Sequence, residues 1–152
     1  MKDYTLYNND AFVVGILQTA IQEEDDIEIT RIALLLPLLF DDKIVAKVCN
    51  IQVSYTIENL VMTNKVPLAN YNDRYISVLP MLYRAIAMML DVNAISMKSG
   101  KLVRRNMEIL SRMIPESNSC RMNSMCVATR SLMKMTYSKD ISKLYKMLNI
   151  EL

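Results

Sequence analysis

The sequence predicts a mostly α-helical protein that folds as a single compact domain with one small β-hairpin. Three observations support this fold class. The chain has 152 residues, a length that suits one domain. Apolar residues make up 52% of it and charged residues 22%, which is enough apolar material for a buried core. Gly occurs only twice, too rarely for a turn-rich all-β domain.

Helix caps and apolar periodicity predict the first two helices. The polar run at 8–10 (Asn-Asn-Asp) provides good N-caps for a helix over 11–21. Thr30 is a candidate cap for a second helix over 31–39. This second segment is apolar nearly all round, as expected for a buried helix. Pro37 should bend or end it, because proline removes a backbone hydrogen bond.

The middle of the chain is predicted to be largely helical as well. Asp41 and Asp42 are candidate caps for a short helix that ends at Val48. The stretch 71–90 has helical periodicity but contains Pro80, which predicts either two helices or one kinked helix. The remaining segments are a short strand or extended connector at 51–55, a helix at 56–62 and a loop at 64–70.

A change from helical to alternating periodicity predicts a β-hairpin over about 94–105, with Gly100 in its turn. A helix that leads directly into a basic hairpin resembles a winged-helix unit. In such a unit that helix would read the major groove of DNA. Here Arg84 is the only cation in that helix, over 81–90, so its composition suits burial or a protein contact better than base reading. Four cations around the hairpin are candidate contacts to DNA phosphate or to an acidic partner surface: Lys98, Lys101, Arg104 and Arg105.

The C-terminal part is predicted to contain two helices within about 122–148. The first runs over 122–135, and the second, over 141–148, has Ser138 as its candidate cap. A short helix at 106–113 and a loop at 115–118 precede them. No linker is long enough to divide the chain, so residues 1–152 are expected to form one domain.

Charge is distributed unevenly along the chain. Residues 1–76 contain six Lys or Arg and eleven Asp or Glu, whereas residues 77–152 contain twelve and five. The acidic side is concentrated at 23–28. A basic half can attract phosphate groups or an acidic protein surface, although solvated helix faces produce the same pattern.

The residue inventory argues against catalysis and against bound metals or cofactors. There is no His, which excludes a His general base or His metal ligand, and two glycines cannot build a Gly-rich phosphate loop. The carboxylate pairs at 25–26 and 41–42 are adjacent residues, whose side chains point in different directions. Cys49, Cys120 and Cys126 lack the close spacing of zinc sites. We therefore expect a protein that is not an enzyme and binds no cofactor.

Thirteen methionines are many for a domain of this size. Met adapts to irregular surfaces, so some of these residues are candidates for a partner interface, while the alternative is flexible filling of the core. The candidate interface residues are Met88, Met89, Met122 and Met125.

The sequence contains no predicted membrane segment. Its longest apolar run, 32–40, is too short to span a bilayer and includes Pro37. No charged segment followed by an apolar stretch suggests a secretory signal, so we expect a cytoplasmic protein.

The order of these segments resembles the middle components of three-component ABC systems. Two departures are Asp10, where the family often has Pro, and Asn149, where Gly is typical. The resemblance rests on the opening at 7–12, the Leu-rich stretch 34–40, the segment 78–80 that leads into the hairpin ending at 100–103, and the tail 128–150.

This resemblance implies a small non-catalytic subunit encoded between an ABC ATPase, often SMC-like or Rad50-like, and an effector that is often a nuclease. Lamassu-type anti-phage defence is an example of such a system. The implied role is an accessory or adaptor subunit that bridges the ATPase and the effector in a hetero-oligomeric complex. Two alternatives remain open: a free-standing winged-helix DNA-binding transcriptional regulator, and a nuclease or hydrolase with an unrecognised carboxylate site.

Overall fold

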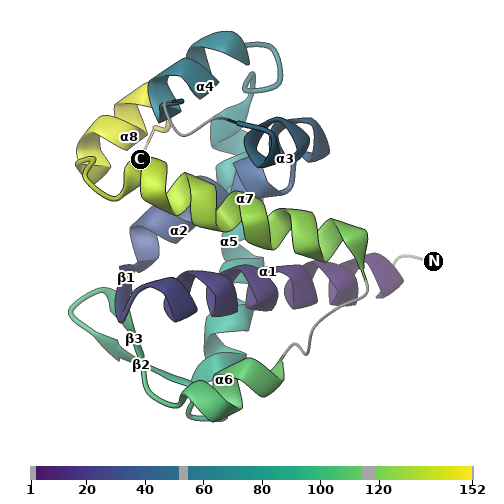
Figure 1. The fold of residues 1–152 in the computed structure, drawn as a ribbon, viewed down its shortest axis with the longest axis vertical. Coiled ribbons are helices and arrows are strands. Elements are labelled where there is room, and N and C mark those ends of the chain that lie inside the picture. Colours follow the sequence, from purple (N-terminus) through teal and green to yellow (C-terminus); the bar gives the residue numbers. More distant parts are fainter. Residues whose placement is uncertain (1–2, 52–54, 114–118, 152) are drawn as a thin grey trace.

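The computed structural model describes residues 3–51, 55–113 and 119–151 (Figure 1). As predicted, the protein is mostly α-helical. The described residues form eight helices and one three-stranded antiparallel sheet. The segment predicted as a strand or connector at 51–55 and the loop predicted at 115–118 lie largely outside the described residues.

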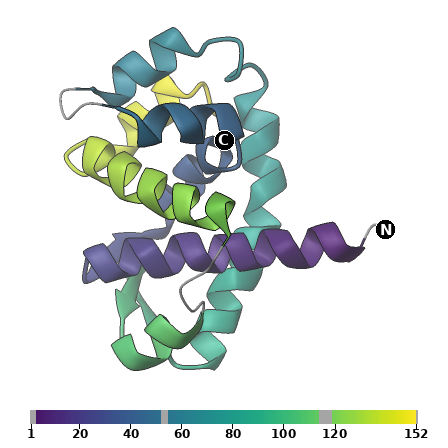
Figure 2. The same cartoon turned by 45° about the vertical axis from the view of Figure 1, so that its right-hand side comes forward.

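Helix α1 (Asp3–Glu23) crosses the middle of the molecule, and α5 (Tyr71–Asp91) runs across it (Figures 1 and 2). The prediction of an N-cap at 8–10 is wrong, because this run lies inside α1. Asp10 instead has a tertiary partner: its carboxylate accepts two hydrogen bonds of 2.9 Å from the guanidinium of Arg84 on α5. A long-range ion pair therefore uses the side chain that the sequence assigned to a local cap.

Three shorter helices come next among the helices of the chain: α2 (Ile29–Leu39), α3 (Asp42–Cys49) and α4 (Ile57–Thr63). The predicted Asp41 cap is confirmed, and Thr56, predicted only as the start of a helix, is the cap of that helix. The carboxylate of Asp41 accepts hydrogen bonds from the first turn of α3, and the hydroxyl of Thr56 accepts one from the first turn of α4. Caps of this kind depend on local sequence alone, which explains why the Asp41 cap was predictable.

Helix α2 differs from its prediction at its start. The N-cap position is Glu28, whereas Thr30 lies inside the helix. Pro37 is also inside α2, and the helix continues two residues beyond it. The Pro37 carbonyl accepts a hydrogen bond of 2.6 Å from Arg74 on α5, which fastens the end of α2 to that helix.

The stretch 71–90 forms one helix, α5, with Pro80 inside it. Its buried face includes Leu82 and Met89, which contact the hydrophobic core. Pro80 lies on the exposed side of α5, so its ring displaces no core residue.

The predicted hairpin is confirmed as β2 (Ile95–Lys98) and β3 (Lys101–Arg104). Both turn residues have left-handed backbone angles, with φ of 50° at Ser99 and 74° at Gly100. This geometry matches the mirror-image turn that suits the twist of a two-residue hairpin. A third strand, β1 (Asp26–Glu28), pairs with β3, so the sheet order is β1-β3-β2. Three residues are too few to show an alternating pattern, and β1 was therefore not predicted.

The last three helices are α6 (Met107–Met113), α7 (Cys120–Thr136) and α8 (Ile141–Met147). The proposed Ser138 cap of α8 is wrong. Asp140 is the N-cap residue, and its carboxylate accepts a hydrogen bond of 2.8 Å from the Ser142 backbone amide. The carboxylate lies directly beside the first turn of α8, whereas Ser138 is two residues further from it.

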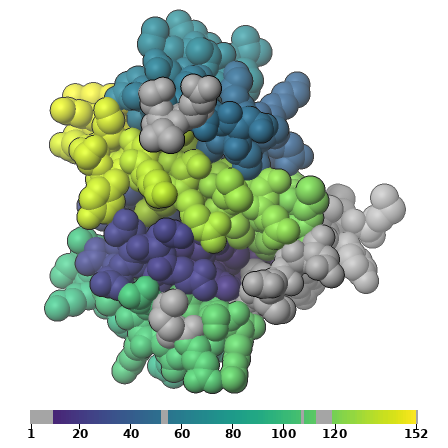
Figure 3. Space-filling view, in the orientation of Figure 1, coloured from purple at the N-terminus to yellow at the C-terminus, as the bar shows by residue number. Residues whose placement is uncertain are grey.

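The core lies between α1, α2, α5 and α7, with α2 buried along almost its whole length. Helix α7 packs along one side of α1, and the hairpin with α6 covers the other (Figure 1). The same order of layers is seen on the molecular surface (Figure 3). This arrangement places the hairpin and the end of α1 side by side.

Candidate interaction site

The four cations predicted as phosphate contacts lie together on the hairpin, but their surroundings differ. Lys98 and Arg105 are exposed, and within the described part of the chain neither has an ion-pair partner. Lys101 and Arg104 are partly buried and are both paired with carboxylates. The predicted basic cluster therefore consists of two free and two neutralised cations.

The partners of the two neutralised cations come from the acidic segment, which we define as Glu23, Glu24, Asp25, Asp26 and Glu28. The Lys101 ammonium lies 2.9 Å from the Asp26 carboxylate, and this hydrogen bond raises the pKa of Lys101. Glu28 also faces Lys101 and adds to the effect. The Arg104 guanidinium forms an ion pair with Asp25 and donates a further hydrogen bond of 3.4 Å to the Gln22 carbonyl.

Backbone pairing holds the acidic segment against the hairpin. In the β1–β3 register Asp26 lies opposite Val103 and Glu28 lies opposite Lys101. One further backbone hydrogen bond extends the pairing at each end. The Arg104 amide donates to the Asp25 carbonyl at 3.0 Å, and the Ile29 amide donates to the Gly100 carbonyl at 3.2 Å. The carboxylates are therefore positioned by the sheet and not by their own ion pairs.

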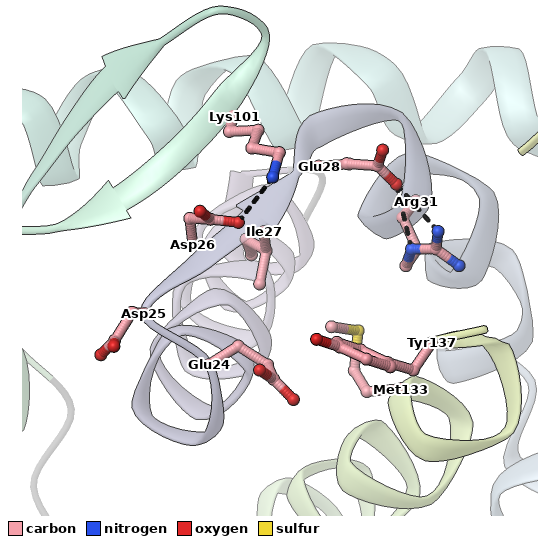
Figure 4. Close-up of a pocket in the computed structure, with 9 residues that line it drawn as sticks. All are labelled: Glu24, Asp25, Asp26, Ile27, Glu28, Arg31, Lys101, Met133 and Tyr137. Carbon is pink, nitrogen blue, oxygen red and sulfur yellow. Dashed lines mark hydrogen bonds and ion pairs between the residues drawn. The ribbon is translucent and has the colours of Figure 1, made fainter.

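A hollow of about 480 Å³ lies between β1, the end of α1 and α7 (Figure 4). The Tyr137 ring forms one wall, and its hydroxyl points across the hollow toward β1. At one end, Arg31 binds the Glu28 carboxylate at 2.9 Å. Asp26 and Glu28 thus direct their carboxylates at cations of this same chain, Lys101 and Arg31.

The methionines predicted as a partner interface are mostly in the core. Met89 and Met125 are fully buried, and Met122 is 7% exposed. Met88 is 49% exposed, so among the four candidates it is the one that a partner can reach in this structure. The helical spacing explains the difference between neighbours, because Met89 shares the buried face of α5 with Leu82 while Met88 points away from it.

The outer face of α5 carries an apolar surface that the sequence interpretation missed. Ile76 is 54% exposed and Tyr83 is 61% exposed. Pro80, which lies between them, and Ala87, one turn after Tyr83, are also exposed. Residues at 76, 80, 83 and 87 follow the spacing of one helix face. This spacing was visible in the sequence. We call these four residues and Met88 the outer α5 face.

The cysteines are free thiols, and Cys49 donates a hydrogen bond of 3.3 Å to the Ser124 carbonyl of α7. Partial burial raises the pKa of Cys49. No group of three or more Cys, Asp or Glu side chains within the described ranges is arranged to hold a metal ion. Every helix in the described part of the chain is too short or too polar to cross a lipid bilayer.

These features define a small α-helical protein whose accessible surface offers charged and apolar contact regions. The family model for the ABC-three component (ABC-3C) system Middle Component 3 matches residues 2–152. The chain therefore belongs to the Middle Component 3 family of ABC-three component systems, and the family resemblance noted in the sequence is confirmed. The comparison with curated proteins found no match, and neither did the comparison with solved structures. Membership of this family indicates an accessory role in a system with partner proteins.

Proposed function

We propose that this protein is the adaptor subunit of an anti-phage complex, in which it bridges an SMC-like or Rad50-like ABC ATPase and an effector such as a nuclease. The observation that carries the proposal is the family match, which extends over nearly the whole chain. In this proposal the protein acts in the cytoplasm, contributes no catalytic residue and binds no cofactor. Lamassu-type defence is the proposed kind of system.

The outer α5 face is the proposed contact surface for one of these partners. It places Tyr83 and Met88 on the exposed side of one helix, together with the side chains of Ile76, Pro80 and Ala87. Tyr and Met are enriched in the buried centres of protein interfaces. An exposed apolar surface of this kind is typical of a subunit that functions in a complex.

Co-expression with the neighbouring ATPase and effector tests the bridging role. We expect the wild-type chain to co-purify with both proteins, and to be required for the ATPase and the effector to co-purify with each other. Absence of binding to either neighbour would exclude the adaptor role.

A matched pair of variants tests the contact surface. Tyr83→Glu introduces a charge into the outer α5 face, whereas Tyr137→Glu alters a second exposed tyrosine on another surface. We expect Tyr83→Glu to weaken binding of one partner at least tenfold, which corresponds to about 1.4 kcal/mol. Tyr137→Glu should bind normally. Equal binding by both variants would place the interface elsewhere.

The sheet topology favours a second candidate function, a winged-helix DNA-binding regulator. Strand β1 follows the first helix and pairs with the hairpin that follows α5, which is the strand order expected of a wing. This candidate predicts sequence-specific duplex binding with a steep salt dependence and loss of binding when Arg104 and Arg105 are replaced. Selection from a random duplex library checks it. Recovery of no preferred sequence would exclude it.

A further inference from the structure

The hairpin and the acidic segment together form a surface whose function the family does not specify. Four cations lie on or beside the β2–β3 hairpin, and β1 pairs along the outer side of β3. Two of these cations, Lys101 and Arg104, are already bound by Asp26 and Asp25. These carboxylates already fill hydrogen-bonding positions of the two cations.

We propose that the acidic segment is a built-in competitor that keeps nucleic-acid phosphate off the hairpin. The intact chain then binds duplex DNA weakly through Lys98 and Arg105, and binding strengthens when the carboxylates of Asp25 and Asp26 are neutralised or displaced. This inference goes beyond the adaptor role and does not depend on it. It concerns only groups within this chain.

The backbone pairing of β1 with β3 keeps the carboxylates in place to compete with phosphate for the hairpin cations. An isolated surface ion pair contributes at most about 1 kcal/mol, so it would yield readily to a polyanion. Here the backbone pairing of β1 with β3 keeps the carboxylates beside the cations whether or not the ion pairs form. The buried side chain of Ile27 packs opposite Leu102 and anchors the same strand. An approaching phosphate therefore meets two held carboxylates at 25–26, and Glu28 beyond them.

Phosphate fits this surface better than an acidic protein does. Strand β1, which carries Asp26 and Glu28, already pairs with β3, and β2 pairs with its other side, so β3 has no free edge for an acidic peptide of a partner. The free cations Lys98 and Arg105 lie at the two ends of the hairpin, where they can contact separate phosphates of a duplex. Helix α5 leads into the hairpin, but its Arg84 is engaged by Asp10, so the contact is expected to be independent of base sequence.

The test compares full-length wild type with an Asp25→Asn/Asp26→Asn variant in binding to a fluorescent duplex. Asn preserves side-chain shape, and the backbone pairing and Ile27 burial are unchanged, so the fold is expected to persist; circular dichroism checks this. We expect at least a tenfold gain in affinity at low salt. The slope of log K against log salt should steepen by about 1.8, because two freed cations each contact a phosphate and release counterions.

A second double variant, Asp42→Asn/Glu58→Gln, is the matched control. It removes the same charge but frees Arg121 and Lys139, whose carboxylate partners lie on α3 and α4 and not beside the hairpin strands. We expect no comparable gain, and we expect Lys101→Gln and Arg104→Gln to reverse the gain of the first variant. Three results would overturn the proposal. The first is no gain in DNA affinity in the Asp25→Asn/Asp26→Asn variant, and the second is an equal gain in the control variant. The third is a gain of the first variant in affinity for poly-glutamate and not for DNA.

Discussion

At the scale of single residues, Arg31 shows how one buried cation joins distant parts of the chain. Its guanidinium donates hydrogen bonds to the Glu28 carboxylate, to the Thr136 carbonyl and, at 3.1 Å, to the Lys139 carbonyl. The side chain is 10% exposed. Arg31 lies near the start of α2, whereas the two carbonyls lie at the end of α7 and in the segment before α8. It therefore connects the buried helix to the C-terminal pair.

We expect Arg31→Met to lower the free energy of unfolding by about 2–4 kcal/mol. Met fills similar space but leaves a buried carbonyl and a carboxylate without their donor, and unsatisfied buried groups of this kind are costly. Urea unfolding followed by circular dichroism measures the change.

The matched control is Arg112→Met on α6. Arg112 pairs with Glu108 one turn away, and both side chains are more than 70% exposed, at 77% and 72%. Exposed pairs of this spacing contribute about 0.5 kcal/mol or less. An equally small effect at Arg31 would contradict its proposed role as a connector.

At the scale of elements, the hairpin turn depends on two residues with left-handed backbone angles. Ser99 occupies the first of these positions and Gly100 the second. The ends of α5 and α8 use the same conformation, with φ of 57° at Asn93 and 53° at Asn149. Asn is among the few non-glycine residues that adopt this region readily. Asn149 thus adopts the backbone conformation that most often takes Gly at the end of a helix.

We expect Gly100→Ala to destabilise the protein by about 1 kcal/mol, because a Cβ atom disfavours positive φ. No other atom lies within 4 Å of the position that this Cβ would occupy, so the loss should come from the backbone and not from a clash. Thermal unfolding measures it.

The companion change Ser99→Asn should act in the opposite direction, with a gain of about 0.5 kcal/mol, because Asn favours this turn position more than Ser does. If Gly100→Ala had no effect, the turn would not adopt this conformation in solution.

At the scale of the whole molecule, the acidic and basic halves of the sequence neutralise each other in space. Of the nine ion pairs found in the described ranges, six join a carboxylate from residues 1–76 to a cation from residues 77–152. The pair between Glu58 on α4 and Lys139 before α8 is one of them. Charge segregation along the sequence is therefore largely a means of intramolecular pairing, and only part of the basic half remains free for a partner.

The pairing between halves predicts a loss of stability in acid, in which Glu58 takes part. The hydrogen bond from Lys139 lowers the pKa of Glu58. Its carboxylate therefore stabilises the fold above the ordinary Glu pKa, and this contribution is lost as pH falls through the lowered value. Because the pair is partly exposed and screened by solvent, the contribution is about 1 kcal/mol or less.

Urea unfolding of wild type and Glu58→Gln between about pH 7 and about pH 3 checks this expectation. Wild type should be the more stable protein at neutral pH, and the two should converge at the acidic end. A difference that persists unchanged at low pH would show that packing and not charge accounts for the effect.

The elements that sequence predicted well are those that local interactions control. Asp41 caps the next helical turn, and the hairpin turn forms from adjacent residues. Predictions failed where a distant residue determined the outcome. Asp10 binds Arg84 and is no cap, and β1 exists only because β3 lies beside it. The candidate site shows the same division, because the positions of the hairpin cations were predicted but their acidic partners were not.

The sequence by itself determined the family, the helical class of the fold and the location of the basic hairpin, since these depend on residue order and short-range geometry. Only the tertiary structure decided that Met122 is buried while Met88 is exposed, and that Asp25 and Asp26 face the hairpin. The physical reason is that burial and charge pairing depend on distances between residues far apart in the chain, which folding alone sets.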